Sequence, residues 1–156
     1  MNNELKKKIA SNWFKTLQNV ICFEIKKLEK PSAKFINTKW KKNKKRKEGG
    51  GEYRILKNGK IFEKIGVNFS EVYGKFPKEI GKKIPGLKKN RQFWASGISV
   101  VMHMKNPKIP AMHFNTRYIF TSYGWFGGGM DVTPCIKDLQ EKKWFHSELK
   151  KTCDLH

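Results

Sequence analysis

The chain has 156 residues, and its 34 lysines and arginines against 13 acidic residues give it a formal net charge of +21. Hydrophobic residues make up 38% of it and aromatic residues 13%, which suffices for a folded core and excludes a wholly disordered polycation. No run of about 18 apolar residues occurs, so a membrane-spanning helix is excluded too. The length suits a single domain, and because the start shows no secretion signal, the expected location is cytoplasmic.

The positive charge comes mainly from lysine, since only four of the 34 basic residues are arginines. It is densest over Lys39–Lys47, and Gly49-Gly50-Gly51 follows, so residues 39–51 are predicted to form a basic, glycine-rich loop. Such a run attracts any polyanion, whether nucleic acid, anionic lipid or a polycarboxylate. A solvated loop of a lysine-rich protein is the simpler alternative, and the sequence leaves both open.

The first half of the chain predicts a helix and a hairpin. Apolar residues recur at steps of three and four over residues 5–28, which indicates an amphipathic helix that ends before Pro31. These residues are Leu5, Ile9, Trp13, Leu17, Val20, Ile21 and Ile25. Farther along, Asn58-Gly59 separates two strand-like runs and suits the positive φ angles of a type I′ turn, so a β-hairpin is predicted.

The second half predicts a loop, three strands and a helix. Residues 75–90, rich in Lys, Pro and Gly, are expected to form a loop with one helical turn. The expected strands cover residues 93–104, 112–122 and 125–131, the last broken by glycines. In a final helix over 136–153, the residues expected to face inward are Leu139, His146, Leu149 and Cys153. The predicted fold class is α+β, an antiparallel β-sheet flanked by helices.

Three cysteines, Cys22, Cys135 and Cys153, are odd in number and far apart in the sequence. Their spacing fits neither a CxxC metal site nor a disulfide framework. Free thiols in a reducing compartment are therefore expected.

Alternation places a set of polar side chains on one face of the two central predicted strands, because side chains two residues apart share a face. The set on the first strand is Ser99, Val101 and His103, and the set on the second is His113, Asn115 and Arg117. An antiparallel pairing with His103 opposite His113 is expected. That pairing would align the two sets into one polar column across both strands.

This polar column favours a ligand site over a core or a plain surface, because the chain fills its solvent-facing positions with lysine. Arg117 would offer a bidentate fork to a carboxylate, and His113 would give or take a proton near neutral pH. Either histidine alone is more often a hydrogen-bonded structural residue. The joint placement is what indicates a site.

Two further groups extend the candidate site. His103, His113 and His146 could converge on a divalent metal, although their spacing matches no recognised zinc pattern. Asp131 follows Gly127-Gly128-Gly129, a run that lacks phosphate-loop spacing and would let a flat ligand approach the backbone. The alternative role of this Asp is a helix cap or a turn.

Three long motifs, in this order along the chain, resemble those of the oxygen-dependent coproporphyrinogen III oxidases. They are GGGEYRILKNGKIFEKIGVNFSEVYG, GISVVMHMKNPKIPAMHFNTRY and GWFGGGMDVTP. The family counterparts have the form FEKAGVNFSHVHG, GVSLVIHPRNPHVPTVHANYRYF and WWFGGGMDLTP. The resemblance covers nearly the whole chain apart from the basic run.

The resemblance implies an enzyme of haem biosynthesis that uses molecular oxygen as co-substrate and no organic cofactor. It would decarboxylate the propionates of rings A and B of coproporphyrinogen III to the vinyl groups of protoporphyrinogen IX. The catalytic residues that it implies are His113, Asp131 and Arg117, and the substrate-binding residues are Ser99, Asn115, Thr116 and Arg117. His113 resembles a proton donor and Asp131 a carboxylate that faces the pyrrole NH groups. His103, His113 and His146 resemble histidines proposed to hold a divalent cation.

The chain also departs from the family pattern. Family members are much longer and homodimeric, and a fourth histidine, a Gly-Gly-Arg loop and the dimer-forming part have no counterpart here. Glu71 and Tyr73 replace two histidines, and Phe114 replaces a small alanine. Residues 1–156 are therefore expected to be a single incomplete domain, the N-terminal half of the fold, apparently truncated and inactive alone.

The expected partners are coproporphyrinogen III and either a second copy or a missing C-terminal half, whereas nucleic acid and membrane are not expected. An unpaired strand edge would make the chain aggregate or depend on that partner. Two alternatives stay open. One is a small basic nucleic-acid-binding protein that uses Lys39–Lys47 with Trp40, and the other is a decayed gene product without activity.

Overall fold

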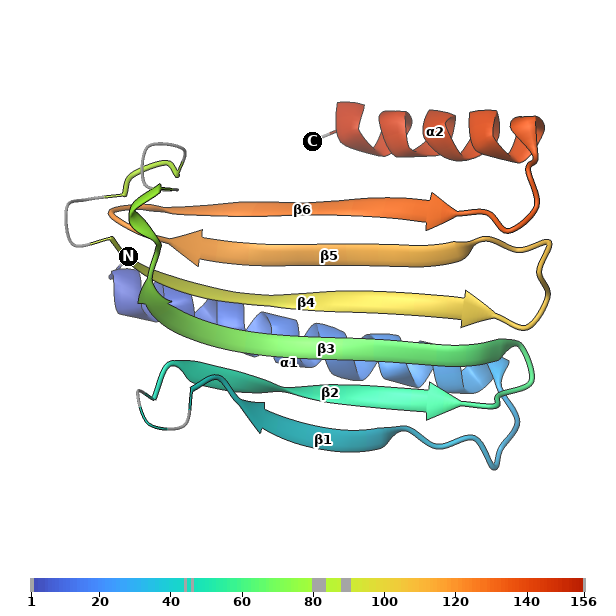
Figure 1. Cartoon of the computed structure of the whole chain (residues 1–156), viewed down its shortest axis with the longest axis horizontal. Helices are drawn as coiled ribbons and strands as arrows, with labels where there is room; N and C mark the ends of the chain where they lie inside the picture. Colours follow the sequence, from blue (N-terminus) through green and yellow to red (C-terminus); the bar gives the residue numbers. More distant parts are fainter. Residues whose placement is uncertain (1, 44, 46, 80–83, 88–90, 156) are drawn as a thin grey trace.

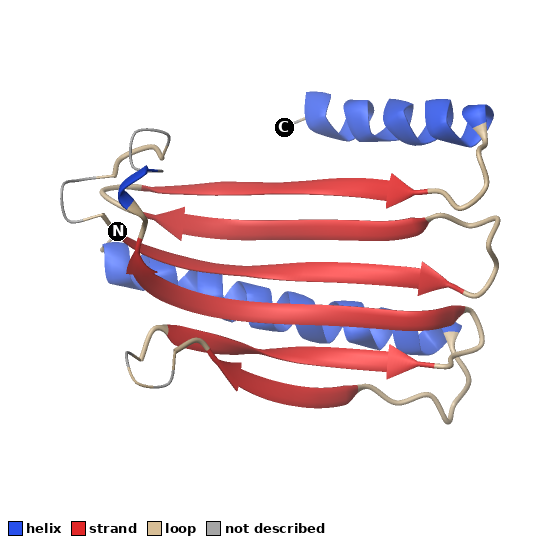
Figure 2. Ribbon diagram, in the orientation of Figure 1, coloured by secondary structure: helices blue, strands red, loops and turns tan. Residues whose placement is uncertain are grey.

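The computed structural model describes residues 2–43, 45, 47–79, 84–87 and 91–155. Six strands form one antiparallel sheet in sequence order, and a long helix packs on one of its faces (Figures 1 and 2). The elements are α1 (Asn3–Leu28), β1 (Ile36–Lys41), β2 (Gly49–Lys57), β3 (Phe62–Lys75), β4 (Gln92–Met104), β5 (Ala111–Phe120), β6 (Gly124–Thr133) and α2 (Leu139–Asp154). The predicted α+β class is confirmed. Neither of these helices is both long and apolar enough to cross a membrane.

Helix α1 crosses β3 and β4 and buries one side chain stripe against them. Its start is capped by Asn2, whose side chain accepts a hydrogen bond from the backbone N–H of Glu4 at 3.0 Å. The stripe consists of Ala10, Ser11, Phe14, Gln18, Cys22 and Ile25. Its buried amide is satisfied, because Gln18 Nε2 donates to the carbonyls of Glu52 and Val67 at 2.9 and 3.0 Å. The core therefore lies between α1 and the middle strands.

The helix was predicted correctly, but four of the seven apolar residues that predicted it lie on its outer side. These are Leu5, Ile9, Trp13 and Val20, and each is about half exposed. The buried stripe contains Ala10, Ser11 and Gln18, whose small or polar side chains a hydrophobic pattern does not count. The helix thus carries two apolar stripes on roughly opposite sides, and packing selected the one with better fit to the sheet.

The predicted basic loop over residues 39–51 is wrong at both ends. Lys39–Lys41 belong to β1, and Gly49–Gly51 belong to β2, where Gly50 and Gly51 pair with strands on both sides. A Cβ atom at Gly51 would lie 2.0 Å from the carbonyl oxygen of Phe69, so the close approach of the backbones requires glycine there. The glycines therefore act as strand residues rather than as a joint. Lys44 and Arg46 of the predicted loop lie outside the described residues.

The hairpin at Asn58-Gly59 is confirmed as the β2–β3 connection, but its turn is longer than the predicted type I′ turn. Residues 58–61 connect the strands, and of the dipeptide only Asn58 has a positive φ, of 55°. Glycine is needed at position 59 for another reason, because a Cβ there would lie 2.3 Å from the carboxylate of Glu29. That carboxylate accepts hydrogen bonds from the N–H groups of Lys60, Ile61 and Phe62 and so ties the end of α1 to the hairpin.

Replacing Glu29 with Gln is expected to lower the free energy of unfolding by about 2 kcal/mol at neutral pH, since it removes charge-assisted hydrogen bonds from the backbone. Burial raises the pKa of this carboxyl, but the N–H groups of Phe62, Lys60, Ile61 and Lys30 lower it by more, so the pKa falls on folding. The stabilisation is therefore complete above the pKa of the unfolded chain and is lost as the pH falls through the lower folded pKa.

Urea unfolding of the wild type and the Glu29→Gln variant near pH 7 and near pH 3 measures this effect. The difference between the two proteins is expected to shrink in acid. A difference of the same size at both pH values would contradict the role given to the carboxylate.

The last part of the chain differs from prediction at two places. Strand β6 runs without a break through its three glycines. Helix α2 begins at its N-cap Asp138 as a regular helix, yet none of its residues is buried and it contacts no other described element. The inward stripe that was expected there, His146 included, is therefore wrong. Residues 80–83 and 88–90 of the predicted loop lie outside the described residues, and the three cysteines are free thiols, as expected.

Candidate functional site

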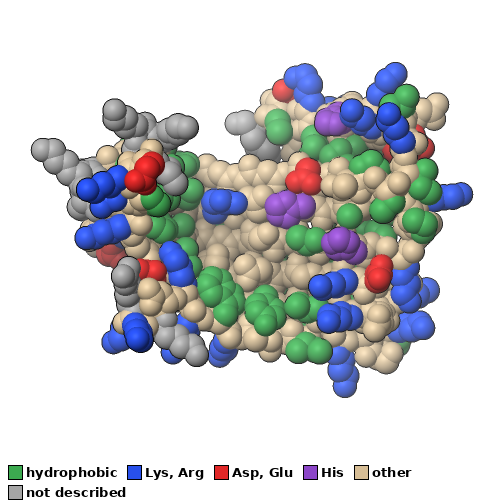
Figure 3. All heavy atoms as spheres, in the orientation of Figure 1, with side chains coloured by type: hydrophobic (Ala, Val, Ile, Leu, Met, Phe, Trp, Pro, Cys, Tyr) green, Lys and Arg blue, Asp and Glu red, His purple; other side chains and the backbone are tan. Residues whose placement is uncertain are grey.

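The predicted polar residues lie on the sheet face opposite α1, which we call the open face because no described helix covers it. The ladder places Ser99 opposite Asn115 across β4 and β5, and His113 opposite Asp131 across β5 and β6. Figure 3 looks onto this face, where histidine and acidic side chains gather over the central and upper strands beside a broad area of backbone and uncharged groups. The shared face predicted from alternation is therefore present.

The register within this face differs from the predicted pairing. Val101, not His103, lies opposite His113, and Gly97, not Ser99, lies opposite Arg117. The six-residue connection over 105–110 shifts the ladder by two residues relative to the expected one. A shift of two leaves every side chain on its predicted face, so the polar residues stay together while His103 moves away from His113.

A chain of hydrogen bonds joins three of the predicted residues. Ser99 Oγ lies 3.3 Å from His113 Nε2, and His113 Nδ1 lies 3.2 Å from Asp131 Oδ2. The carboxylate can accept only from a protonated Nδ1, so it orients the ring and leaves Nε2 as the nitrogen that exchanges a proton at the open face. The side chains of His113 and Asp131 are 39% and 64% exposed, so both can reach a ligand.

Arg117 and Asn115 form a second pair beside this chain. Arg117 Nη2 donates to Asn115 Oδ1 at 2.6 Å, which fixes the guanidinium while leaving its other donors available. Arg117 is in no ion pair with a described residue. An exposed guanidinium without a carboxylate partner is suited to bind a carboxylate of a ligand.

Glycines leave a smooth floor between these polar groups. Gly66, Gly127 and Gly129 lie on the open face, and a Cβ atom at any of them would meet nothing within 4 Å. The floor is therefore open space above bare backbone. At these positions a flat ligand could approach the backbone closely, which is the role predicted for the glycine run.

Two residues of the open face, Asn68 and Trp40, were not placed on this face from the sequence. Asn68 lies opposite Ser99 on β3, and its Oδ1 accepts a hydrogen bond from Trp40 Nε1 at 3.2 Å. Trp40 was assigned to the basic loop, which hid its place on a strand. Alternation carried back through β3 would have put Asn68 on the polar face.

The three-histidine cluster is not formed. Among the residues that the structure describes, no three His, Cys, Asp or Glu side chains are placed to hold one metal ion. His103 lies opposite Lys64 on β3. His146 lies on α2, and this helix contacts none of the described strands. Thr116 also leaves the predicted site, since it lies between Asn115 and Arg117 and therefore points to the α1 face.

The fold and the candidate site define an antiparallel α+β protein with a sheet face that no described helix covers and that carries a cluster of polar side chains. Comparison with known proteins gives the family: residues 9–156 match the family model of coproporphyrinogen III oxidase, and the chain belongs to this family.

Individual relatives agree with this assignment. The oxygen-dependent coproporphyrinogen-III oxidase of Rickettsia felis is 48% identical over 157 residues, which covers 95% of this chain and 54% of the relative. Those of Rickettsia typhi and Rickettsia prowazekii are each 47% identical over 163 residues, covering 99% of this chain and 56% of the relative. The chain thus spans about half the length of the curated relatives it matches, and it corresponds to their N-terminal half.

Proposed function

We propose that this chain provides the substrate-binding face of an oxygen-dependent coproporphyrinogen III oxidase, an oxidoreductase of haem biosynthesis. The observation that carries the proposal is the Ser99–His113–Asp131 hydrogen-bond chain, which lies beside Arg117 on a floor of glycines. The substrate is a broad macrocycle with carboxylates at its rim and NH groups at its centre. On this face, a cation can bind the rim carboxylates, a carboxylate can accept from the central NH groups, and the glycines leave room for the ring.

The reaction removes carbon dioxide from the propionates of rings A and B. In each, the carboxylate leaves one methylene carbon as carbon dioxide, the other methylene carbon, which is attached to the pyrrole ring, loses a hydrogen, and a vinyl group forms. Dioxygen takes up the two electrons and, with one further proton, leaves as hydrogen peroxide. No organic cofactor is needed for this balance. We assign no divalent cation to His103, His113 and His146, because they do not lie together.

The residues of the open face have different roles in binding the substrate and in transferring a proton. Arg117, held by Asn115, binds a propionate carboxylate. Asp131 accepts hydrogen bonds from pyrrole NH groups, and His113 moves a proton at Nε2. Ser99, within hydrogen-bond distance of that nitrogen, keeps the ring in place and contacts substrate.

We further infer that turnover needs a cover over the open face. Asp131 and His113 are in contact with solvent, and no described element shields them. Since water weakens each electrostatic contact at the reacting carbon, the chain alone is expected to bind substrate but not to convert it. The cover is supplied by a second copy in a homodimer or by a separate C-terminal half.

Replacing Arg117 with Ala is expected to weaken the binding of coproporphyrin III, the air-stable oxidised form of the substrate, about tenfold or more, since a charge-assisted pair is lost. Fluorescence titration of the whole chain measures this. Lys142→Ala on α2 removes the same charge away from the open face and is expected to change nothing. Equal losses of affinity in both variants would show that net charge alone holds the ligand and would contradict the proposal.

The structure does not favour the alternative hypothesis of a nucleic-acid-binding protein. That alternative combined the lysines of the basic run with Trp40 and nearby aromatic residues. Lys39 and Lys41 project to the α1 face, whereas Trp40 projects to the open face and bonds to Asn68. The basic run therefore does not present an aromatic platform between its charges. A decayed gene product stays an untested alternative, which the Arg117 titration addresses.

A further inference from the structure

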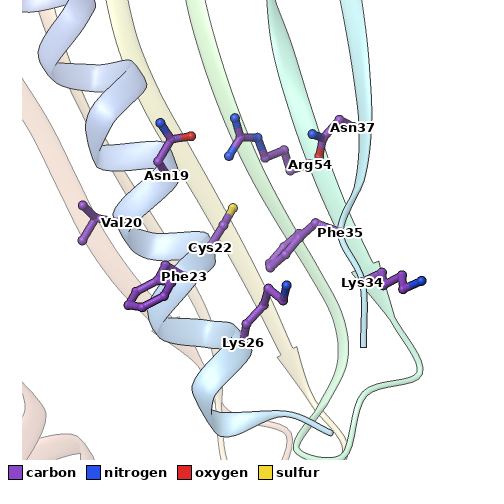
Figure 4. Close-up of a pocket in the computed structure, with 9 residues that line it drawn as sticks. All are labelled: Asn19, Val20, Cys22, Phe23, Lys26, Lys34, Phe35, Asn37 and Arg54. Carbon is purple, nitrogen blue, oxygen red and sulfur yellow. The ribbon is translucent and has the colours of Figure 1, made fainter. Parts of the chain in front are cut away.

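A second cationic surface lies on the α1 face, in a groove between α1 and the β1–β2 hairpin. Two adjoining hollows of about 820 and 710 Å³ share Asn19 and Arg54 and so form one continuous groove, which we call the α1–β1 groove. Figure 4 shows the second of them, with α1 on one side and β1 and β2 on the other. Because the sheet separates this groove from the open face, it is not part of the site described above.

Lysines line the first hollow from both sides. Alternation along β1 turns Lys39 and Lys41 toward α1, and the β1–β2 turn adds Lys42 and Lys47. Lys15 of α1 lines the same hollow. On the sheet side, Gly50 lies opposite Lys41 and contributes no side chain.

The positive charge of this hollow is only partly neutralised within the described residues. Lys39, Lys41 and Lys47 are in no ion pair there. Two carboxylates, those of Glu52 and Glu71, also line this hollow, but neither pairs with these lysines. Glu52 pairs with Arg54 at 2.8 Å, and Glu71 accepts the hydroxyl hydrogen of Ser11. Like charges that line one hollow repel one another, and a bound anion would relieve that repulsion.

The second hollow is less charged along its floor. Phe35 points from the start of β1 toward Cys22 of α1, and Asn19 and Asn37 place amide groups beside them (Figure 4). Burial raises the pKa of the Cys22 thiol against the opposing effect of Arg54. The cations of this hollow are Lys26, Lys34 and Arg54, and no described acidic side chain lines it. The groove thus has a cationic end and a mainly apolar end.

We propose that the α1–β1 groove binds an oligophosphate, a short chain of linked phosphate groups, with the phosphates among Lys39, Lys41 and Lys47. Several ammonium groups around one compact hollow suit a ligand that carries several negative charges on neighbouring atoms, and lysine is an effective point-charge partner for phosphate. An inorganic oligophosphate would fill the lysine end alone. A nucleoside oligophosphate would also place its base against Phe35 in the apolar end.

Calorimetric titration of the whole chain with tripolyphosphate at low salt tests the proposal. We expect saturable one-to-one binding that the triple variant Lys39→Gln, Lys41→Gln, Lys47→Gln weakens about tenfold. The matched control Lys137→Gln, Lys142→Gln, Lys143→Gln removes the same charge outside the groove and is expected to leave the affinity within about twofold. Thermal unfolding of both variants checks that each is folded. Amide NMR shifts of the wild type give a readout without mutation, since ligand should move the signals of Gly49–Gly51.

The same titration with ATP identifies the source of the phosphates. Tighter binding of ATP than of tripolyphosphate, abolished by Phe35→Ala, would support a nucleotide, and equal affinities would support an inorganic ligand. Absence of saturable binding, or equal losses in the two triple variants, would overturn the proposal. An affinity found only for oligonucleotides and rising with their length would assign the lysines to nucleic acid instead. None of these outcomes depends on the proposed oxidase function, because Arg117 lies on the other face.

Discussion

Replacing His113 with Ala is expected to slow the decarboxylation of coproporphyrinogen III about 10²- to 10⁴-fold, the range that a positioned proton-transfer group contributes. His113 is the central residue of the hydrogen-bond chain, since Asp131 and Ser99 each bond to one of its ring nitrogens. Its removal takes away both the exchanging proton and the ordered link between the two neighbours. The loss should appear in kcat rather than in substrate affinity, because Arg117 stays in place.

The assay combines this chain with the remaining half of the Rickettsia felis relative, to which the proposal assigns the cover over the open face. His103→Ala is the matched control, as it removes the same ring from the same face but outside the hydrogen-bond chain. Equal losses in the two variants would refute the role of His113. Protoporphyrinogen formation by this chain alone would refute the inference that a cover is needed.

Replacing Gly127 and Gly129 together with Val is expected to weaken coproporphyrin III binding by about 100-fold while leaving the thermal stability unchanged within a few degrees. Each new side chain would enter empty space, since a Cβ there meets no atom within 4 Å, and valine is favoured in strands. The same side chains would lift a broad ligand off the floor. Displacement from Arg117 and Asp131 removes contacts whose combined loss corresponds to about 100-fold in affinity.

Met130→Val is the control for this experiment, because it lies on the same strand but on the α1 face. Circular dichroism melting and fluorescence titration of the three proteins separate folding from binding. A double variant that binds as tightly as the wild type would show that the ligand does not lie on the glycine floor. One that unfolds early would show that β6 itself requires glycine at these positions.

Local sequence patterns predicted much of the fold and of the candidate site correctly. The spacing of apolar residues located α1, Asn58-Gly59 located a hairpin, and alternation put Ser99, His113 and Arg117 on one face. These are properties of a single helix or strand, so they do not depend on distant parts of the chain. The motifs around Asp131 indicated the family, which the comparisons then confirmed.

The predictions that were wrong concern features that depend on contact between two segments of the chain. Two stripes of α1 are apolar, and only packing against β3 and β4 selects the buried one. Gly49–Gly51 look like a joint until strands pair with Gly50 and Gly51 on both sides. The helix at the end of the chain has an amphipathic pattern with no described surface to cover, so the inward place expected for His146 was wrong.

By itself, the sequence determined the two helices, the β2–β3 hairpin and the three later strands, the antiparallel α+β class, and which residues of β4 and β5 share a face, but it did not locate β1. Only the tertiary structure decided the register that places Asp131 at His113 and Asn68 beside Ser99, and that separates His103 from both other histidines. It also decided that the lysines of β1 and the arginine of β5 project to opposite sides of the sheet. The physical reason is that alternation is fixed within one strand, whereas register and facing are set by pairing and packing between segments far apart in the chain.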